Sequence, residues 1–362
     1  MSPGDMPTRL RRCMKNELHL IESVATVRDA LRALNALPGG LMTLFVAEEG
    51  RVIGTLTDGD IRRALIAGAS LDTPAANIAF RRFLALRPQD SRFELFAEAR
   101  SKGIRLLPCL DAEGRLTEII DLSLTRAALP IEAVLMAGGK GERLRPLTNN
   151  CPKPLLKVGE KAIIDYNVEE LLRCGAHRVF VTVNYLKEQI IEHFSSEDMR
   201  EKIVCVEEPR RMGTIGSLSL IAEQLEEETL LLMNSDLLTS LDFEALYRHH
   251  LDSGADLTMG AVPYTVSVPF SILKTEGEKV VGVTEKPTFN YFAGAGVYMM
   301  RTGLARKIPK GEYLDAPDFV ASLIEEGRRV SFFPIEGTWI DIGSPDDYRY
   351  ANEILSNRLV NR

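Results

Sequence analysis

The sequence has little cysteine, little histidine and no long apolar segment. Its 362 residues include five histidines and five cysteines, which are widely spaced and form no Cys-x-x-Cys pair. This spacing excludes a disulfide frame and a cysteine zinc site, and we expect reduced thiols in a cytoplasmic protein. No stretch approaches about 20 uninterrupted apolar residues, which excludes a membrane-spanning helix. Met1 to Leu20 has basic residues but no apolar run after them, so we expect no secretory signal there.

The chain also has no excess of basic residues. The chain has 51 acidic and 44 basic side chains and a formal net charge of -7, which gives no electrostatic reason to expect a nucleic acid as partner. Apolar residues make up 45% and charged residues 26%, the balance of a folded globular protein. Since a domain usually takes about 100–200 residues, the length favours two domains.

A pattern of helices and strands occurs twice in the first third, at an interval of roughly 60 residues. The first copy predicts a helix capped by Thr26, a hairpin of two strands and a second helix, at residues 26–34, 41–47, 52–56 and 61–65. The second copy predicts a helix and a hairpin, at residues 93–100, 104–110 and 115–120.

This repeat resembles a tandem pair of CBS (cystathionine-β-synthase-type) modules over about residues 18–125. The resemblance implies a regulatory nucleotide at Gly54–Asp60, with Thr57 at the phosphate and Asp60 at the ribose hydroxyls. The second copy lacks the Thr-x-x-Asp spacing, so we expect one nucleotide per chain. The alternative is a pair that only dimerises. A CBS module over residues 1–125 and a linker over residues 126–130 are the expected boundaries.

From residue 131 to residue 362, short apolar strands alternate with helices. The strands are expected at residues 133–136, 178–183, 203–206 and 230–233, and the helices at residues 163–174, 186–194, 217–225 and 348–359. This alternation predicts an α/β fold with a Rossmann-like, doubly wound, mostly parallel but mixed sheet. In such sheets, ligands bind at the carboxyl ends of the strands.

The first of these strands ends in a glycine-rich loop followed by cations. Gly138, Gly139 and Gly141 lack Cβ atoms, which lets backbone N–H groups approach an anion closely. The loop is no Walker A sequence, because no Ser or Thr follows a Gly-Lys pair. Arg143 lies just beyond it, and Lys153 lies between two prolines that fix the flanking backbone. This combination predicts a polyphosphate site.

These residues resemble the sugar-1-phosphate nucleotidyltransferases, or nucleoside-diphosphate-sugar pyrophosphorylases. Their signature is Gly-Gly-x-Gly-Thr-Arg-Leu-x-Pro-Leu-Thr followed by Pro-Lys-Pro; here Glu142 stands at the position of the Thr. The resemblance covers nearly all of residues 131–350. It implies the nucleotidyltransferase type A fold and an enzyme of class EC 2.7.7.

The resemblance also implies the site residues. For the nucleotide these are Ala137, Gly138, Gly139, Gly141, Arg143, Asn184, Gly213, Thr214 and Gly216. The sugar phosphate is expected at Glu285, Lys286 and Gly296. The expected catalytic residues are Arg143, Lys153, Asp236 and Asp341. Both aspartates follow strands and would hold Mg²⁺, which takes hard oxygen ligands.

The expected reaction is transfer of a nucleoside monophosphate to a sugar-1-phosphate, with release of pyrophosphate. Because several negative charges converge in it, the site needs positioning and charge neutralisation rather than a protein nucleophile. The CBS-fused layout resembles guanylyltransferases that make GDP-hexosamine or GDP-heptose donors for bacterial surface glycans and nonulosonic acids such as legionaminic acid. This favours GTP and glucosamine-1-phosphate.

Several alternatives stay open at this point. One is UTP, CTP or dTTP with mannose-, glucose- or heptose-1-phosphate, and another is CTP with phosphocholine. An alternative of a different class is a non-catalytic nucleotide-sugar sensor. The expected partners are the two substrates and a second copy of the chain bound through the CBS modules, with no nucleic acid and no membrane.

Overall fold

The protein is described by a computed structural model that covers residues 16–123 and 127–360. The chain divides into two compact units, Met1–Ala128 and Leu129–Arg362. Three predictions concern residues outside the described ones: the reduced thiol of Cys13, the absence of a secretory signal in residues 1–15, and the start of the linker at residue 126. Cys109, Cys151, Cys174 and Cys205 are free thiols. None of the described helices is both long enough and apolar enough to cross a membrane.

The first unit contains the predicted repeat. Its first copy comprises η1 (Asn16–His19), β1 (Leu20–Glu22), α1 (Val27–Ala36), η2 (Pro38–Gly40), β2 (Thr43–Glu48), β3 (Arg51–Thr57), α2 (Asp58–Ile66) and α3 (Ala75–Ile78). Strand β2 pairs in parallel with β1 and antiparallel with β3. Helix α2 begins three residues before the predicted start because Thr57 caps it.

The second copy has α4 (Arg92–Ser101), β4 (Leu106–Leu110) and β5 (Leu116–Asp121). Leu86 bridges in parallel to Cys109 of β4, as β1 does to β2. The two copies share one apolar core, in which Phe45 and Val52 of the first pack with Leu106 and Ile119 of the second. They therefore form a single folding unit.

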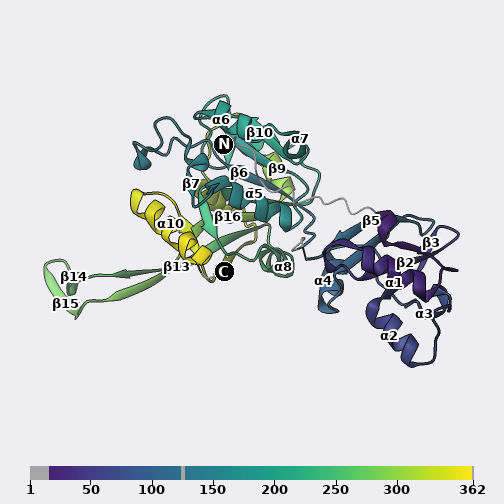
Figure 1. Ribbon diagram of the computed structural model, residues 1–362. Helices are drawn as coiled ribbons and strands as arrows, with labels where there is room; N and C mark the ends of the chain where they lie inside the picture. The colour runs from purple at the N-terminus through teal and green to yellow at the C-terminus, as the bar shows by residue number, and fades with distance from the viewer. Residues whose placement is uncertain (1–15, 124–126, 361–362) are drawn as a thin grey trace. The chain divides into compact units, whose positions relative to one another are not determined.

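The second unit is built on a seven-stranded sheet with the order β10-β9-β6-β11-β16-β13-β17 (Figure 1). The strands are β6 (Ile131–Met136), β9 (Val179–Val183), β10 (Ile203–Glu207), β11 (Thr229–Asn234), β13 (Leu257–Ser267), β16 (Thr288–Arg301) and β17 (Val330–Pro334). Strands β10, β9, β6 and β11 are parallel, whereas β16 runs antiparallel to both of its neighbours. The mixed, doubly wound α/β fold is thus confirmed.

Helices and short elements complete this unit. The helices are α5 (Ile163–Arg173), α6 (Lys187–His193), α7 (Glu197–Arg200), α8 (Phe243–Ser253), α9 (Ala316–Glu325) and α10 (Pro345–Val360). The short elements are η3 (Glu142–Leu144), η4 (Lys153–Leu155), η5 (Gly216–Leu220), η6 (Thr302–Lys307), β7 (Lys157–Val158), β8 (Lys161–Ala162), β12 (Leu237–Thr239) and β18 (Trp339–Asp341). Side chains from β6, β9, β11 and β16 meet in the main core, among them Val134, Phe180, Leu232 and Tyr298.

The helix predicted at residues 217–225 is wrong. The segment forms the short 3-10 helix η5 and then turns, with i→i+3 bonds such as Leu218 N to Ile215 O at 3.0 Å. The N–H groups of Ile215 and Gly216 donate to the carbonyl of Leu314 at 3.0 and 3.2 Å. This tertiary contact fixes the start of the segment and overrides its local helical pattern.

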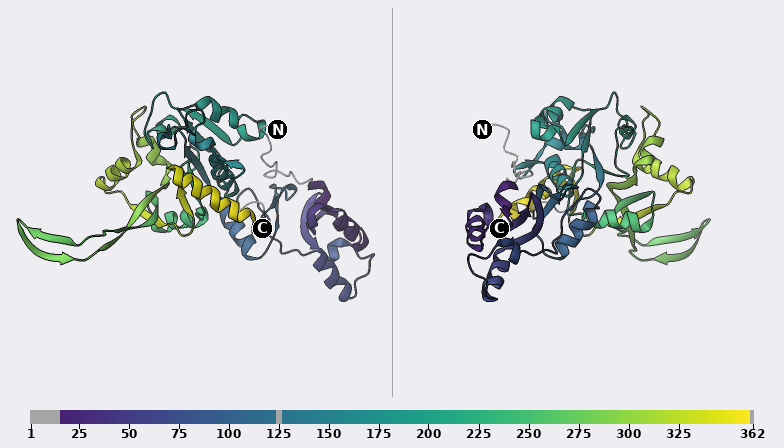
Figure 2. Two further views of the ribbon diagram at one scale, coloured as in Figure 1. Left: turned by 60° about the vertical axis from the view of Figure 1, so that its left-hand side comes forward. Right: turned by 90° about the vertical axis from the view of Figure 1, so that its right-hand side faces the viewer.

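A long two-stranded ribbon projects from this unit in both views of Figure 2. It is the outer part of the β13–β16 pair, continued by β14 (Ile272–Glu276) and β15 (Lys279–Thr284). We call residues 263–292 the arm. This ribbon was not predicted from the sequence.

Candidate active site

The ends of β6 and β11 bring the glycine-rich loop next to Asp236. Asn234, the last residue of β11, is in register with Met136, the last residue of β6. Ser235 then donates from its hydroxyl to the carbonyl of Met136 at 2.7 Å. The loop that begins at Ala137 and the segment that carries Asp236 therefore lie side by side at this edge of the sheet.

A small antiparallel pair brings the second aspartate to the same place. Leu237 of β12 is in register with Asp341 of β18. The N–H of Ile342 also donates to the carbonyl of Asp236 at 3.2 Å. Helix α10 packs on β18 and β7 and helps to hold this pair. Two carboxylates that are far apart in the sequence thus become neighbours.

The cations expected at the site lie beside these carboxylates. The Lys153 ammonium donates to Oδ2 of Asp236 and lies 3.8 Å from Oδ1 of Asp341. Its side chain is only 12% exposed. The Arg143 guanidinium packs against Gly343, two residues after Asp341: a Cβ atom at Gly343 would lie 3.2 Å from Nη2. The structure therefore brings the four predicted catalytic residues together.

The electrostatics of this cluster are unbalanced. Burial, followed by the negative charge of Asp236, raises the pKa of Asp341 above its usual value, against the opposing effect of Lys153 and Arg143. Oδ1 of Asp236 is buried and has no hydrogen-bond partner among the described residues. Because such an atom is costly to bury, we interpret it as a ligand-binding position.

This donor set fits a magnesium ion that is shared with substrate. Within residues 16–123 and 127–360, no group of three or more His, Cys, Asp or Glu side chains is placed to enclose a metal. Two carboxylates remain, Asp236 and Asp341. Mg²⁺ is commonly held by one or two carboxylates together with substrate phosphates. The unpartnered oxygen of Asp236 is the observation that favours such a position.

A buried glutamate that the sequence analysis missed lies against the glycine-rich loop. Glu208 follows β10, and its N–H donates to the carbonyl of Val183 at 2.9 Å. A Cβ atom at Gly138 would lie 2.9 Å from Oε1 of Glu208, so any other residue there would displace this carboxylate. Asn184, a predicted nucleotide ligand, donates to the Glu208 carbonyl at 3.2 Å.

Glu208 carries the marks of a functional carboxylate. It is 6% exposed. Burial raises its pKa, against a hydrogen bond from the Met212 backbone and the positive charge of Arg211. A buried carboxyl group with a raised pKa beside a ligand loop is a candidate binding residue. The available signal was its position directly after an apolar strand, the same signal that identified Asp236.

The predicted base-contacting loop is held by a second residue that the sequence analysis missed. Asp315 accepts from Thr214 N at 2.9 Å and from its hydroxyl at 3.3 Å. Burial alone would raise the pKa of Asp315, but hydrogen bonds from Tyr313 and Thr214 outweigh it and lower the pKa. Gly213 has φ of +78°, and a Cβ atom there would meet the Leu314 backbone. Packing against residues 312–315 is thus a structural reason for this glycine.

The expected sugar-phosphate residues are less closely assembled. Gly296 of β16 lies against the Asn234 side chain, at the catalytic edge. Glu285 and Lys286 are on the arm and exposed, and Glu285 accepts a hydrogen bond from Ser271. Within the described residues, no hydrogen bond or ion pair joins either of them to the catalytic residues. The structure therefore places Gly296 at the catalytic edge. Among the described residues, Glu285 and Lys286 have no hydrogen bond or ion pair that would place them there.

In the first unit, the Thr57 and Asp60 side chains bind each other. Asp60 Oδ2 accepts from Thr57 N at 2.8 Å and from its hydroxyl at 2.6 Å, while Oδ1 accepts from Arg63 at 2.5 Å. This is a capping box at the start of α2.

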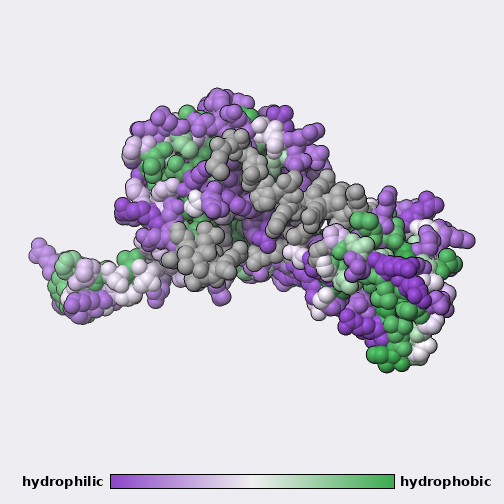
Figure 3. Space-filling model, in the orientation of Figure 1, coloured by the Kyte–Doolittle hydropathy of each residue, from purple (hydrophilic) through white to green (hydrophobic). Residues whose placement is uncertain are grey.

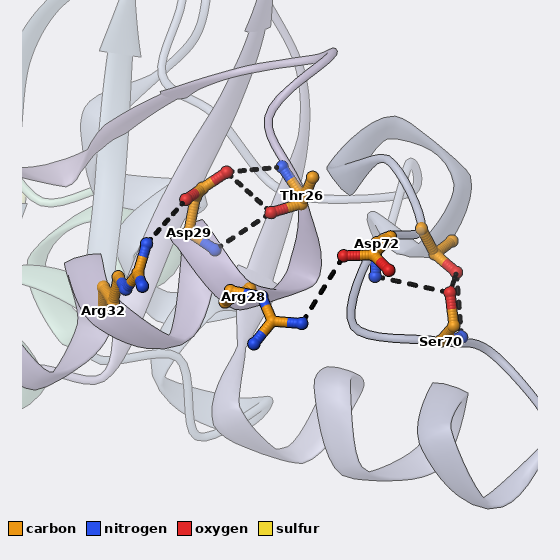
Figure 4. A network of polar contacts seen from close by, with 7 residues as sticks. Thr26, Arg28, Asp29, Arg32, Ser70 and Asp72 are labelled. Atoms are coloured by element: carbon orange, nitrogen blue, oxygen red, sulfur yellow. Dashed lines mark hydrogen bonds and ion pairs between the residues drawn. The ribbon is translucent and has the colours of Figure 1, made fainter.

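The same device occurs at Thr26 and Asp29, where no nucleotide contact was predicted (Figure 4). There Asp29 accepts from Thr26 N at 3.1 Å and from Arg32 at 3.5 Å. Arg28 pairs with Asp72, whose N–H donates to Ser70. The Thr-x-x-Asp spacing is therefore explained at both positions by helix capping.

Comparison with known proteins agrees with the two units. The nucleotidyl transferase family model matches residues 132–358, and the CBS domain model matches residues 10–67. The mannose-1-phosphate guanylyltransferase catalytic subunit beta of Danio rerio is 28% identical over 226 residues, 60% of this chain and 62% of that protein. The protein of the same name in Dictyostelium discoideum is 28% identical over 243 residues, 64% of this chain and 66% of that protein.

This chain thus spans 62% and 66% of the length of these two curated relatives. The crystal structure of HddC from Yersinia pseudotuberculosis superimposes with a TM-score of 0.50 at 23% identity, covering 62% of this chain and 99% of that one. That likeness concerns the fold alone. The family match over residues 132–358, which is more than half of the chain, shows that the protein belongs to the nucleotidyl transferase family.

Proposed function

We propose that this protein is a sugar-1-phosphate guanylyltransferase, which converts GTP and a sugar-1-phosphate to a GDP-sugar and pyrophosphate. The observation that carries the proposal is the Lys153–Asp236–Asp341 cluster at the carboxyl edge of the sheet. An oxygen of the sugar phosphate attacks the α-phosphorus of GTP, and the bond to the pyrophosphate oxygen breaks. No side chain needs to form a covalent bond.

The residues have distinct roles in this proposal. Lys153 and Arg143 neutralise the triphosphate and the charge that develops at the α-phosphate. Asp236 and Asp341 would hold Mg²⁺, which supplies further neutralisation of phosphate charge when bound. The backbone N–H groups of the loop at Gly138–Gly141 bind the phosphates and orient them for in-line attack.

Glu208 supports guanine as the base. An ionised carboxylate only accepts hydrogen bonds, and it has two oxygens to do so. Guanine offers two adjacent donors, N1–H and the N2 amino group, whereas adenine, cytosine and uracil each pair a donor with an acceptor at the corresponding edge. Glu208 beside Gly138 therefore matches guanine best. The names of the relatives, which are guanylyltransferases, point the same way.

The sugar is a hexose-1-phosphate in this proposal. The CBS-fused layout favours glucosamine-1-phosphate, and the names of the relatives favour mannose-1-phosphate. Lys286 would bind the sugar phosphate and Glu285 a hydroxyl or amino group. GDP-sugars of this kind serve surface-glycan synthesis, and a cytoplasmic location fits the four free thiols.

For the first unit we propose a regulatory role with one nucleotide at Thr57 and Asp60. Binding would require Asp60 to exchange part of its capping box for the ribose hydroxyls. The CBS module would also associate with a second copy. Exposed apolar side chains in this unit, among them Ile66 and Phe80, support this, and Figure 3 shows apolar surface there.

A pyrophosphate-release screen tests the proposal. The full chain is assayed with five nucleoside triphosphates, each against glucosamine-, mannose-, glucose- and heptose-1-phosphate, with and without Mg²⁺. We expect release that depends on GTP, Mg²⁺ and one sugar phosphate. Release with another triphosphate would overturn guanine but keep the chemistry. No release with any pair, while GDP-sugars bind, would favour the non-catalytic sensor.

A further inference from the structure

A long loop joins β6 to the short helix η4, which begins at Lys153. The loop spans residues 137–152 and includes the glycine-rich turn that is proposed to bind phosphates. Its own backbone hydrogen bonds are turns, such as Leu144 N to Gly141 O and Leu147 N to Leu144 O, both at 3.0 Å. Turns of this kind shape the loop but do not fix its position relative to the sheet.

Two side chains from a neighbouring segment hold this loop. The Tyr185 hydroxyl donates to the carbonyl oxygens of Thr148 and Asn149, at 3.0 and 3.1 Å. Nε2 of Gln189 donates to the carbonyl of Asn150 at 3.0 Å. Within the described residues, these are the side-chain hydrogen bonds that reach the loop from other elements. Tyr185 therefore contributes most of the polar contact that fixes this end of the loop.

Thr148 links Tyr185 to the proposed phosphate-binding groups. Thr148 is fully buried, and its hydroxyl donates to the carbonyl of Gly141 at 2.8 Å. A Cβ atom at Gly141 would lie 3.0 Å from Cγ2 of Thr148 and 3.0 Å from Cβ of Lys153. Gly141 thus packs closely against both side chains. A displacement of Thr148 would therefore displace Gly141 and alter its contact with Lys153.

The segment that carries Tyr185 is held in place independently of the loop. Nδ2 of Asn184 donates to the carbonyl of Glu208 at 3.2 Å, and Ile190 of α6 is fully buried. Leu186 has φ of +50°, a left-handed conformation that is strained for a leucine. Such strain persists only where the surrounding structure imposes it, and it concentrates at functional sites. The residue after Tyr185 is one such position.

We propose that Tyr185 is a positioning residue for the nucleotidyl transfer. Its hydroxyl acts through Thr148 to keep the glycine-rich turn and Lys153 at the right distance from the triphosphate, and it does not itself touch the nucleotide. The proposal rests on the proposed function, because it takes the loop as the triphosphate site. Since a misplacement of about 1 Å can slow a reaction on the order of 10²-fold, a loop of this length needs such an anchor.

The experiment compares two variants that each remove one phenolic hydroxyl. Tyr185→Phe keeps the ring and loses the hydrogen bonds to the loop. Tyr166→Phe is the matched control, because the half-buried Tyr166 donates to the carbonyl of Val158, outside the loop, at 2.8 Å. Steady-state pyrophosphate release and thermal melts are measured on the full chain.

We expect Tyr185→Phe to lower kcat/KM for the triphosphate about tenfold or more and to leave KM for the sugar phosphate within about twofold. The control should keep all constants within about twofold of the wild type. A merely structural hydroxyl would lower the melting temperature without this difference between the two substrates. Equal kinetic constants for the two variants, or an equal loss for both substrates, would overturn the proposal.

A double-mutant cycle tests whether Tyr185 acts through Thr148. Thr148→Val removes the hydroxyl that binds Gly141, and Thr148→Ser, which keeps it, is the control. Because the two residues are in contact, the effects of Tyr185→Phe and Thr148→Val should not add: the double variant should be no more than about twofold slower than the slower single variant. Losses that multiply would show that Tyr185 does not act through Thr148.

Hydrogen exchange gives a measurement that does not depend on activity. Amides of residues 138–150 should exchange about tenfold faster in Tyr185→Phe than in the wild type or Tyr166→Phe, and a non-hydrolysable GTP analogue should bind about tenfold more weakly. These changes without pyrophosphate release from any substrate pair would overturn the proposed reaction but support the positioning of the loop. Unchanged loop exchange in an active enzyme would overturn the positioning role alone.

Discussion

Two polar clusters of this protein each contain an aspartate, but the hydrogen bonds of the two aspartates differ. In the first unit, Thr57 and Asp60 are three positions apart, and both Asp60 oxygens accept hydrogen bonds from the local turn. In the second unit, Lys153 and Asp236 are 83 positions apart, and one Asp236 oxygen is buried without a partner. In the first cluster every Asp60 oxygen is hydrogen-bonded, and the cluster caps a helix. In the second cluster one Asp236 oxygen has no partner among the described residues and can bind a ligand.

The energetics of the two clusters explain the difference. A capping box satisfies N–H groups that a helix start would otherwise expose, so it stabilises the fold without any ligand. Carboxylates held together at a sheet edge destabilise the free protein and are retained where binding makes up the cost.

The largest effect is expected for Lys153→Ala. Removing the cation nearest to Asp236 should lower kcat on the order of 10²–10³-fold, the scale for losing one charge stabiliser. Lys187→Ala is the matched control, because Lys187 pairs with Glu207 at 2.6 Å on the surface. It should leave kcat within about twofold. Steady-state pyrophosphate release measures both, and equal kcat values for the two variants would contradict the assignment.

The next effect concerns the base. Glu208→Gln replaces one acceptor of the carboxylate by a donor, so kcat/KM for GTP should fall roughly 10- to 100-fold. The relative use of UTP should rise, because uracil offers one donor and one acceptor. The neighbouring Glu207→Gln removes an exposed charge and serves as control. If both variants keep the wild-type preference for GTP over UTP, Glu208 does not select the base.

A third prediction compares the two capping boxes. Asp29→Ala and Asp60→Ala should each lower the melting temperature of the first unit slightly by removing a cap. Only Asp60→Ala should lose stabilisation by a nucleotide, which for a ligand at 100 times its Kd amounts to about 2.7 kcal/mol. Thermal melts with adenine, guanine, uracil and cytosine nucleotides measure this. Equal nucleotide shifts in both variants would leave Asp60 a capping role alone.

The smallest effect is on stability. Because its folded pKa is raised above 3.8, ionised Asp341 costs the folded state more than the unfolded state. That cost is absent below the unfolded pKa and complete above the folded one. Asp341→Asn should therefore melt about 1–2 °C higher than the wild type at pH 7, a small gain because the carboxyl is partly exposed.

The pH dependence checks the cause of that gain. The difference in melting temperature between Asp341→Asn and the wild type should shrink as the pH falls through the folded pKa toward 3.8. The variant should also lose turnover at every pH. A stability gain that is the same at pH 3.5 and pH 7 would show that ionisation of Asp341 is not its origin.

The sequence predicted the catalytic edge because its residues have local signals. Asp236 lies just past one strand, Asp341 ends another, and Lys153 lies between prolines, so their positions could be inferred before their contacts were known. Glu208 has the same signal, but it stands beside Glu207, and a pair of glutamates resembles a solvated turn. Only burial distinguishes them, since Glu207 is exposed and Glu208 is not.

Other features depend on contacts that the sequence does not display. The 3-10 helix at Gly216–Leu220 replaces the predicted helix because the Leu314 carbonyl takes two N–H groups at its start. The arm does carry the alternation that predicts strands, at Tyr264–Val268 and Thr288–Tyr291, but its length depends on the pairing of β13 with β16, which the local pattern does not display. The Thr-x-x-Asp spacing is compatible with a cap and with a nucleotide site, and the structure shows a cap at both Thr26 and Thr57 of the first copy.

The most direct measurement of the central claim is Mn²⁺ binding, with Mn²⁺ in place of Mg²⁺, followed by electron paramagnetic resonance of the free ion. The wild type and Asp236→Asn are titrated in the presence of a non-hydrolysable GTP analogue, with Asp29→Asn as control. We predict one Mn²⁺ per chain for the wild type and the control, and at least tenfold weaker binding for Asp236→Asn. Equal Mn²⁺ affinity in all three proteins would show that the unpartnered oxygen of Asp236 does not bind the metal.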